Sequence, residues 1–239
     1  MTALFRSELL KLRTTRTAVV LALGLYLITG IAVVAALVVN DSLDRSVQRD
    51  LPGSAGFAVL FSILFGILVM TGEYRHGTAT PTFLATPQRE RVLIAKALAA
   101  LVGGLTLALS SLMLVYAVAV PWLLATGNSV LLFERDALRD PLGLVVACAI
   151  WGALGVGIGA VVRSQVGAMI GVLVWFLILE PLVGHVLSGV APYLPGAGLE
   201  AIFSDSDDLS AWAGAAVSLG YAAAFCAVGT VLTARRDIT

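Results

Sequence analysis

Long apolar stretches separated by short polar breaks run through the whole chain. Each reaches or approaches the ~20 residues that a helix, rising ~1.5 Å per residue, needs to cross a hydrocarbon layer ~30 Å thick. Backbone groups in lipid must be paired within the segment, which favours helices, and the alternation typical of a membrane barrel is absent. The pattern predicts an all-α, polytopic membrane protein with six transmembrane helices at about residues 18–39, 54–72, 97–125, 142–162, 166–186 and 211–232.

The composition supports a single membrane domain. Of the 239 residues, 59% are hydrophobic and 13% are charged, whereas soluble domains average ~25% charged residues. No polar stretch is long enough to form a soluble domain, so residues 1–239 are predicted to form one transmembrane domain.

In this topology the basic residues lie mostly on one side of the membrane, although the formal net charge of the chain is zero. Four of the 15 Lys and Arg residues fall on the side opposite the termini, namely Arg45, Arg49, Arg135 and Arg139. The other basic residues fall on the side of the termini. Basic residues are retained in the cytoplasm during insertion. We therefore predict a multi-pass protein of the plasma membrane with both termini cytoplasmic.

The segment after the fifth predicted span is apolar but rich in helix breakers. Its glycines and prolines are Gly184, Gly189, Pro192, Pro195, Gly196 and Gly198. This density forbids a straight crossing and favours short re-entrant or surface helices on the outer side. The form of residues 187–210 stays open at this point.

Two pairs of glycines have the spacing of small residues at helix contacts in membranes. Gly155 and Gly159 form one pair, and Gly167 and Gly171 form the other. We expect these faces to pack within the chain by default.

The motif search excludes several enzyme classes. The chain has no phosphate-binding loop, because its only lysines, Lys11 and Lys96, follow Leu10 and Ala95 rather than glycine. It also lacks the His-Glu-x-x-His zinc motif and the Gly-x-Ser-x-Gly nucleophile elbow. We predict no catalytic residues, no metal site and no ATP hydrolysis by this chain.

Glu180 is the only acid placed well inside a predicted span. Charge within a membrane is expensive and often marks a transport path, so Glu180 is a candidate for an outer gate or path residue. The alternative is a structural carboxylate that reaches the outer interface just before Pro181.

The polar loop between the second and third spans carries a specific pattern, running from Gly72 to Arg91. Its glycine and threonine residues can end one helix and cap another, and Pro87 marks a further boundary. The loop is either a short structured element or an ordinary basic loop.

With these residues, the chain resembles the type-two ATP-binding-cassette permeases, which are the membrane subunits of exporters whose nucleotide-binding subunit is a separate polypeptide. The resemblance covers essentially the whole chain. It rests on residues 7–16, on residues 73–78 with 84–87, Arg91 and Lys96, and on the proline-rich residues 180–195.

The resemblance implies a cytoplasmic coupling helix that docks on the ATPase. We assign Glu73, Tyr74, Arg75, His76, Gly77, Thr78 and Thr86 to this coupling site. It also implies an N-terminal interfacial helix, to which Glu8, Lys11 and Arg13 belong. The implied partners are the ATPase, a second permease copy or paralogue, and membrane lipid, with no nucleic acid. No cofactor is expected in this chain, because the ATPase would bind ATP and Mg.

These observations predict the permease subunit of an ATP-driven exporter with an unidentified substrate. Two alternatives stay open. One is a membrane subunit that binds a partner without transporting, of the immunity or sensor type. The other is an intramembrane enzyme, which would need convergent polar groups at one depth, whereas the spans offer mostly isolated Ser and Thr residues.

Overall fold

The computed structural model describes residues 5–8, 10, 16–40, 42–75, 88–204 and 209–235. Every regular element in these ranges is helical. The long helices are α2 (Arg16–Val39), α4 (Phe57–Arg75), α6 (Arg89–Ala125), α7 (Arg139–Val162) and α11 (Ala211–Arg235). The short ones are α3 (Arg45–Asp50), α8 (Gln165–Val174), α9 (Glu180–Val186) and α10 (Pro195–Phe203).

Six helical stretches in the described ranges are long and apolar enough to cross a membrane, which confirms the predicted all-α fold with six spans. The second of them joins α3, a 3₁₀ turn at Leu51–Ala55 and α4. The fifth joins α8, a π-helical turn at Trp175–Leu179 and α9.

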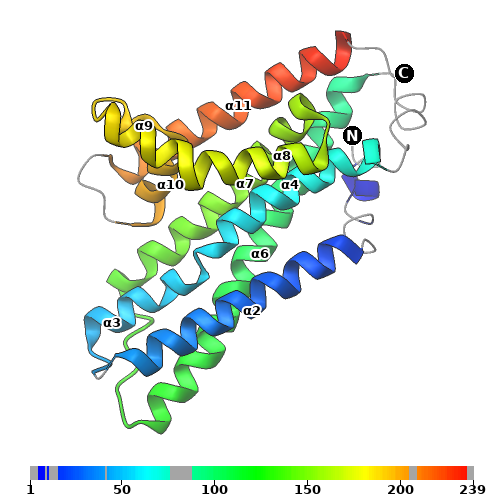
Figure 1. Ribbon diagram of the computed structural model, residues 1–239. Coiled ribbons are helices and arrows are strands. Elements are labelled where there is room, and N and C mark those ends of the chain that lie inside the picture. The colour runs from blue at the N-terminus through cyan, green and yellow to red at the C-terminus, as the bar shows by residue number, and fades with distance from the viewer. Residues whose placement is uncertain are drawn as a thin grey trace.

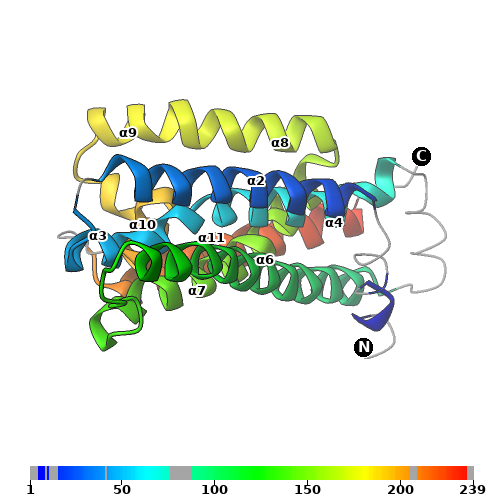
Figure 2. The same ribbon diagram turned by 90° about the horizontal axis from the view of Figure 1, so that it is seen from below.

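The helices form an elongated bundle with two different ends (Figures 1 and 2). Residues 5–8, the end of α4, the start of α6 and the end of α11 lie at one end, which we call the terminal end. Helices α3, α9 and α10 lie at the other, which we call the far end. Of the described basic residues, Arg6, Arg75, Arg91, Lys96 and Arg163 belong to segments at the terminal end.

Helix α7 lies at the centre of the bundle, packed against α4, α6 and α11. In an apolar 18-residue stretch of the α3–α4 span and of the α7 span, 61% of the residues are buried, and in that of the α6 span 50% are. In the corresponding stretches of the α2, α8–α9 and α11 spans only 17% of the residues are buried, so these helices present most of their surface outward.

Glycines bring the backbones of α7 and its neighbours into direct contact. A Cβ added to Gly155 would overlap the Ile63 carbonyl of α4, and one added to Gly152 would lie 2.5 Å from the Ala100 carbonyl of α6. On another side of α7, a Cβ on Gly157 would lie 2.8 Å from the Cys226 nitrogen of α11. Only glycine allows such close approach between helices at these positions.

The two predicted glycine pairs behave differently. Gly155 and Gly159 both face α4, so this pair packs within the chain as predicted. Gly171 has nothing within 4 Å, and Gly167 meets only Ser164 and Val162 near its own position. The expectation of packing within the chain is therefore wrong for this second pair, because α8 is a peripheral helix and turns these glycines away from the bundle.

The region after the fifth span contains the short helices that its glycines and prolines predict. A 3₁₀ turn at Ala191–Tyr193 leads into α10, which packs against α7 and α11. Pro195, Gly198, Ala201 and Ile202 of α10 are buried. Helix α10 thus packs against the first turns of α7 and α11 at the far end.

The third helix differs from its predicted bounds. We predicted a span from residue 97, but α6 begins at Arg89. Residues 89–96 are mostly strong helix formers, so the helix continues beyond the apolar stretch. This extension places Lys96 inside the helix rather than in a loop.

At the far end, Gln48 of α3 joins the connection before α3 to the connection between α6 and α7. Its Nε2 donates to the carbonyl oxygens of Leu43 and Ser129, each at 2.9 Å, and its Oε1 accepts from the Leu131 amide at 2.8 Å. Asp44 caps α3. Hydrogen bonds from the Val47 amide and the Ser46 hydroxyl hold the pKa of its carboxyl below the usual value.

We expect Gly155→Val to destabilise the bundle, because its side chain would meet the α4 backbone, which cannot move aside alone. The loss should reach at least the ~1–3 kcal/mol typical of overpacked cores. Denaturant titration in detergent micelles measures it. Gly30→Val is the matched control, since nothing lies within 4 Å of a Cβ at Gly30 of α2. Equal stability of the two variants would contradict the packing described here.

Candidate functional site

The last three residues of α4 contact three different parts of the bundle at the terminal end. Glu73 forms an ion pair with Lys96 of α6. Tyr74 lies beneath the guanidinium of Arg163, and Arg75 donates to Gln165 at the start of α8. These residues end α4 immediately before residues 76–87, which lie outside the described ranges.

Lys96 is the centre of a buried ion cluster. Its Nζ lies 2.8 Å from Glu73 Oε1 and 2.9 Å from Glu8 Oε2, and it also donates to the Val69 carbonyl at 3.4 Å. The exposed fractions are 1% for Lys96, 3% for Glu8 and 8% for Glu73. The ion cluster, defined as Glu8, Glu73 and Lys96, therefore joins the N-terminal segment, α4 and α6.

Charges buried in this way are stabilised only together. Transfer of a single ammonium or carboxylate from water to the interior costs several kcal/mol, and a partner with good geometry offsets that cost. Removal of one partner takes away part of this compensation while the other charges stay buried. The ion cluster thus fixes the relative positions of the N-terminal segment, α4 and α6.

Arg163 is a second junction. It adopts a left-handed conformation, with φ of 58°, where α7 ends, and its amide donates to the Gly159 carbonyl at 2.9 Å. Its Nη2 donates to the Leu232 carbonyl of α11 at 3.2 Å, and its guanidinium carbon lies 5.5 Å from the centre of the Tyr74 ring. Arg163 therefore connects α4, α7 and α11 through a cation–π contact and a hydrogen bond.

Arg75 supplies the third connection. Its Nη1 donates to Gln165 Oε1 at 3.3 Å. Helix α8 begins at Gln165, with Ser164 as its cap. A displacement of the α4 end can thus act on α8 directly.

Of the predicted coupling residues, the structure brings Glu73, Tyr74 and Arg75 into one network. Four others, His76, Gly77, Thr78 and Thr86, lie outside the described residues, as do Lys11 and Arg13 of the predicted interfacial helix. Glu8, which belongs to the same predicted helix, is buried against Lys96.

The sequence reasoning did not assign Lys96 or Arg163 to a site: Lys96 entered only in the motif that carries the resemblance, and Arg163 only as a basic residue between two spans. A signal for Lys96 was present. The residues three and four positions away on either side are Val92, Leu93, Ala99 and Ala100, all apolar and all buried. In a helix these share a face with Lys96, which predicts a buried lysine.

Glu180 lies at the far end, where it connects three segments. Its Oε2 accepts from Trp175 Nε1 at 2.9 Å, and its Oε1 accepts from the amides of Gly196 and Ala197, the latter at 3.3 Å. The carboxylate thereby satisfies amide groups at the start of α10, where negative charge is favourable. A Cβ on Gly196 would lie 2.6 Å from Glu180 Oε1, so a side chain there would displace the carboxylate.

These contacts give Glu180 a structural function. A role in a path or an outer gate stays a prediction, because its position at the far end is compatible with both. Within the described ranges, no group of three or more His, Cys, Asp or Glu side chains is placed to hold a metal ion.

Comparison with known proteins gives one family. The family model described as "ABC-2 family transporter protein" matches residues 38–201, which is more than half of the chain. The matched range includes Glu73, Lys96 and Glu180 and ends within α10. No curated protein gives a significant match.

We expect Lys96→Met to destabilise the protein by about 3–5 kcal/mol, because two buried carboxylates lose their shared cation. Denaturant titration in micelles measures the loss. Arg91→Met is the control, since Arg91 is an exposed basic residue of the same helix. Combining Lys96→Met with Glu8→Gln and Glu73→Gln should recover most of the stability. If Lys96→Met behaves like Arg91→Met, the ion cluster does not hold these segments together.

We expect Glu180→Ala to lower stability by about 1.5–3 kcal/mol, the usual loss for hydrogen bonds to a charged group. Glu200→Ala is the matched control, because Glu200 is an exposed acid of α10. Glu180→Gln keeps an acceptor oxygen, so it distinguishes the structural role of Glu180 from its predicted role in an outer gate. If Glu180→Gln is as stable as the wild type but fails in transport, the predicted gate role gains support. A loss of stability from Glu180→Ala no larger than from Glu200→Ala would contradict the structural role.

Proposed function

We propose an export function on the premise that this chain belongs to the ABC-2 family of transporter permeases. The family's membrane components lack an ATPase of their own and work with a nucleotide-binding subunit. The chain would be the membrane-spanning subunit of an ATP-driven exporter, with both termini cytoplasmic in the plasma membrane. ATP and Mg would be bound by the partner subunit.

One observation carries this proposal. The end of α4 enters residues 76–87 directly, and each of its last three residues contacts a different part of the bundle. A force applied by an ATPase to residues 76–87 would therefore reach α6 and the N-terminal segment through Glu73. It would reach α7 and α11 through Tyr74 and Arg163, and α8 through Arg75.

The burial of Glu73 divides the coupling motif into two parts. Glu73 is buried in the ion cluster, where an ATPase surface cannot reach it. Its role would be to transmit a movement of the α4 end to α6 and the N-terminal segment. We assign docking to His76, Gly77, Thr78 and Thr86, with Lys11 and Arg13 of the N-terminal segment on the adjoining membrane surface. Transport would then proceed as a rigid-body shift of packed helices between two arrangements.

The peripheral spans offer surfaces for the other proposed partners, which are membrane lipid and a second permease. Helices α2, α8–α9 and α11 present mostly apolar outer faces, which can contact lipid or a second permease copy or paralogue. Glu180 would act near the outer gate, at the opposite end of the bundle from the ATPase. The substrate would leave at this far end.

The test separates docking from transmission. Tagged permease is purified with the ATPase subunit, and basal ATP hydrolysis of the complex is measured in nanodiscs. We expect Gly77→Val to reduce the copurified ATPase while leaving membrane insertion intact. Arg75→Gln should retain the ATPase but lower ATP hydrolysis, by up to about tenfold if one charged hydrogen bond is lost.

Arg91→Gln is the matched control, because it removes an exposed arginine near the start of α6. Normal binding and hydrolysis in both Gly77→Val and Arg75→Gln would contradict the coupling role. ATPase binding without any effect of the permease on hydrolysis would favour the non-transporting partner subunit instead. If the unmodified tagged permease recovers no ATPase, the alternative of an intramembrane enzyme would be favoured.

A further inference from the structure

The fifth span changes its helical type between its two halves. Helix α8 is followed at Trp175–Leu179 by the π-helical turn, in which the Glu180 amide donates to the Trp175 carbonyl five residues earlier, and α9 comes next. In an α-helix the same amide would bond to the carbonyl four residues earlier. The π turn therefore holds one residue more than an α-helical turn. Such turns are rare and frequently lie at functional sites.

Pro181 gives a physical reason for the π turn. Proline has no amide hydrogen, and inside an α-helix its ring clashes with the carbonyl four residues earlier. Here that carbonyl belongs to Leu177, in the middle of the π turn. The wider turn lets the carbonyl avoid the ring. Membrane helices nevertheless tolerate proline, so an α-helical form of this turn is disfavoured without being forbidden.

The hydrogen bond between Trp175 and Glu180 depends on the π turn. Trp175 Nε1 donates to Glu180 Oε2 at 2.9 Å. Residues five apart in an α-helix lie ~140° apart around the axis, because a full turn takes 3.6 residues. Bonding between positions five apart brings them to the same face instead. The other Glu180 oxygen accepts from the amides of Gly196 and Ala197, so the π turn allows one carboxylate to hold both the indole and α10.

The two halves of the span are held differently, although they follow one edge of the bundle from the terminal end to the far end (Figure 2). Helix α8 packs against α4 and α7, and Gln165 at its start accepts from Arg75. The π turn contacts α7 through Phe176, whose ring centre lies 4.7 Å from that of Trp151. Helix α9 packs mainly against the turns on either side of it, and no residue of the π turn is buried. The core therefore offers little resistance to a rotation of α9.

We propose that the π turn is a switch of helical type that holds the far end closed or releases it. Conversion to an α-helical turn would rotate α9 by ~100° and move it by ~1.5 Å relative to α8, which is the share of one residue. This rotation would break the bond between Trp175 and Glu180 and withdraw the carboxylate from Gly196 and Ala197, freeing the start of α10. The proposal rests on the proposed function in taking the far end as the outer end.

The experiment is hydrogen exchange, read by mass spectrometry, on the full-length permease in nanodiscs without an ATPase. The amides of Gly196 and Ala197 are the readout, because their exchange reports release from Glu180. We expect Trp175→Phe to accelerate their exchange by about tenfold or more, the effect of one hydrogen bond to a charged group. Trp212→Phe is the matched control, because Trp212 of α11 is 86% exposed.

Pro181→Ala distinguishes a change of helical type from the loss of a hydrogen bond. It leaves the side-chain donors to Glu180 in place but removes the clash that disfavours an α-helix, so exchange at Gly196 and Ala197 should again rise. Deletion of Ile178 in the Pro181→Ala background then removes the extra residue of the π turn. Trp175 and Glu180 become four residues apart and share a face of an α-helix. Exchange should therefore return to the level of the unmodified protein.

Deletion of Leu177 removes the same extra residue and serves if the first deletion fails to fold. Unchanged exchange in Pro181→Ala would overturn the proposal, even if Trp175→Phe exchanges faster, because the indole bond would then be structural only. Equal exchange in Pro181→Ala with and without the deletion would also overturn it, as would an equal rise in the amides of α7, which would show general loosening. Since no ATPase is present, a failure of the copurification test would remove the proposed function and leave these results intact.

Discussion

Backbone contact between α7 and its three neighbours is the constraint on which this bundle depends. In lipid there is no hydrophobic driving force between helices, so association relies on close van der Waals packing. Glycines supply that closeness on both sides of the contact: Gly152, Gly155 and Gly157 on α7, and Gly66 and Gly104 on α4 and α6. A side chain at any of these positions would separate helices that must stay in register.

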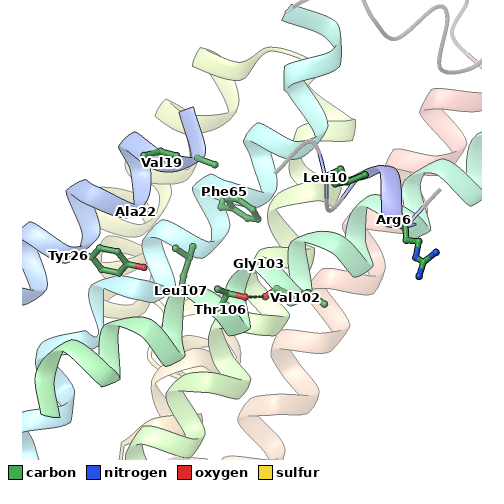
Figure 3. A pocket seen from close by; sticks show the side chains of 11 residues that line it. Arg6, Leu10, Val19, Ala22, Tyr26, Phe65, Val102, Gly103, Thr106 and Leu107 are labelled. Carbon is green, nitrogen blue, oxygen red and sulfur yellow. Dashed lines mark hydrogen bonds between the residues drawn. The ribbon is translucent and has the colours of Figure 1, made fainter. Parts of the chain in front are cut away.

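This packing divides the molecule into a rigid centre and a looser periphery. Helices α4, α6 and α7 bury half or more of the residues in their apolar stretches, whereas α2 and α8–α9 bury few. Helix α2 is attached to α6 partly through the Tyr26 and Ser110 hydroxyls, and an apolar crevice of about 850 Å³ between α2, α4 and α6 opens beside this contact (Figure 3). Peripheral helices are free to meet lipid or another subunit, while the centre keeps the two ends of the bundle in a fixed relation.

Polar side chains join segments at both ends of the bundle. At the terminal end, Lys96 and Arg163 join segments through charged side chains. At the far end, Gln48 and Glu180 bond mainly to backbone amides and carbonyls. Ion pairs also occur at the far end, between Arg45 and Glu134 and between Arg49 and Asp140, but their side chains are partly exposed. The ion cluster at the terminal end is buried. The terminal end is also where α4 leads toward the predicted docking residues.

The sequence by itself determined the fold class, the six spans, the glycine pair at Gly155 and Gly159, and the break into short helices after the fifth span. These features are local: the length of an apolar run, the spacing of small residues and the density of proline are all read within one segment. Tertiary structure decided which polar residues meet. Glu8 and Lys96 are 88 positions apart, and Glu180 and Gly196 are 16 apart. Burial of Lys96 could have been inferred from its apolar neighbours on the helix, but its two carboxylate partners could not. The crevice likewise exists only because α2 lies beside α4 and α6, and no run of residues along the chain encodes a space between three helices.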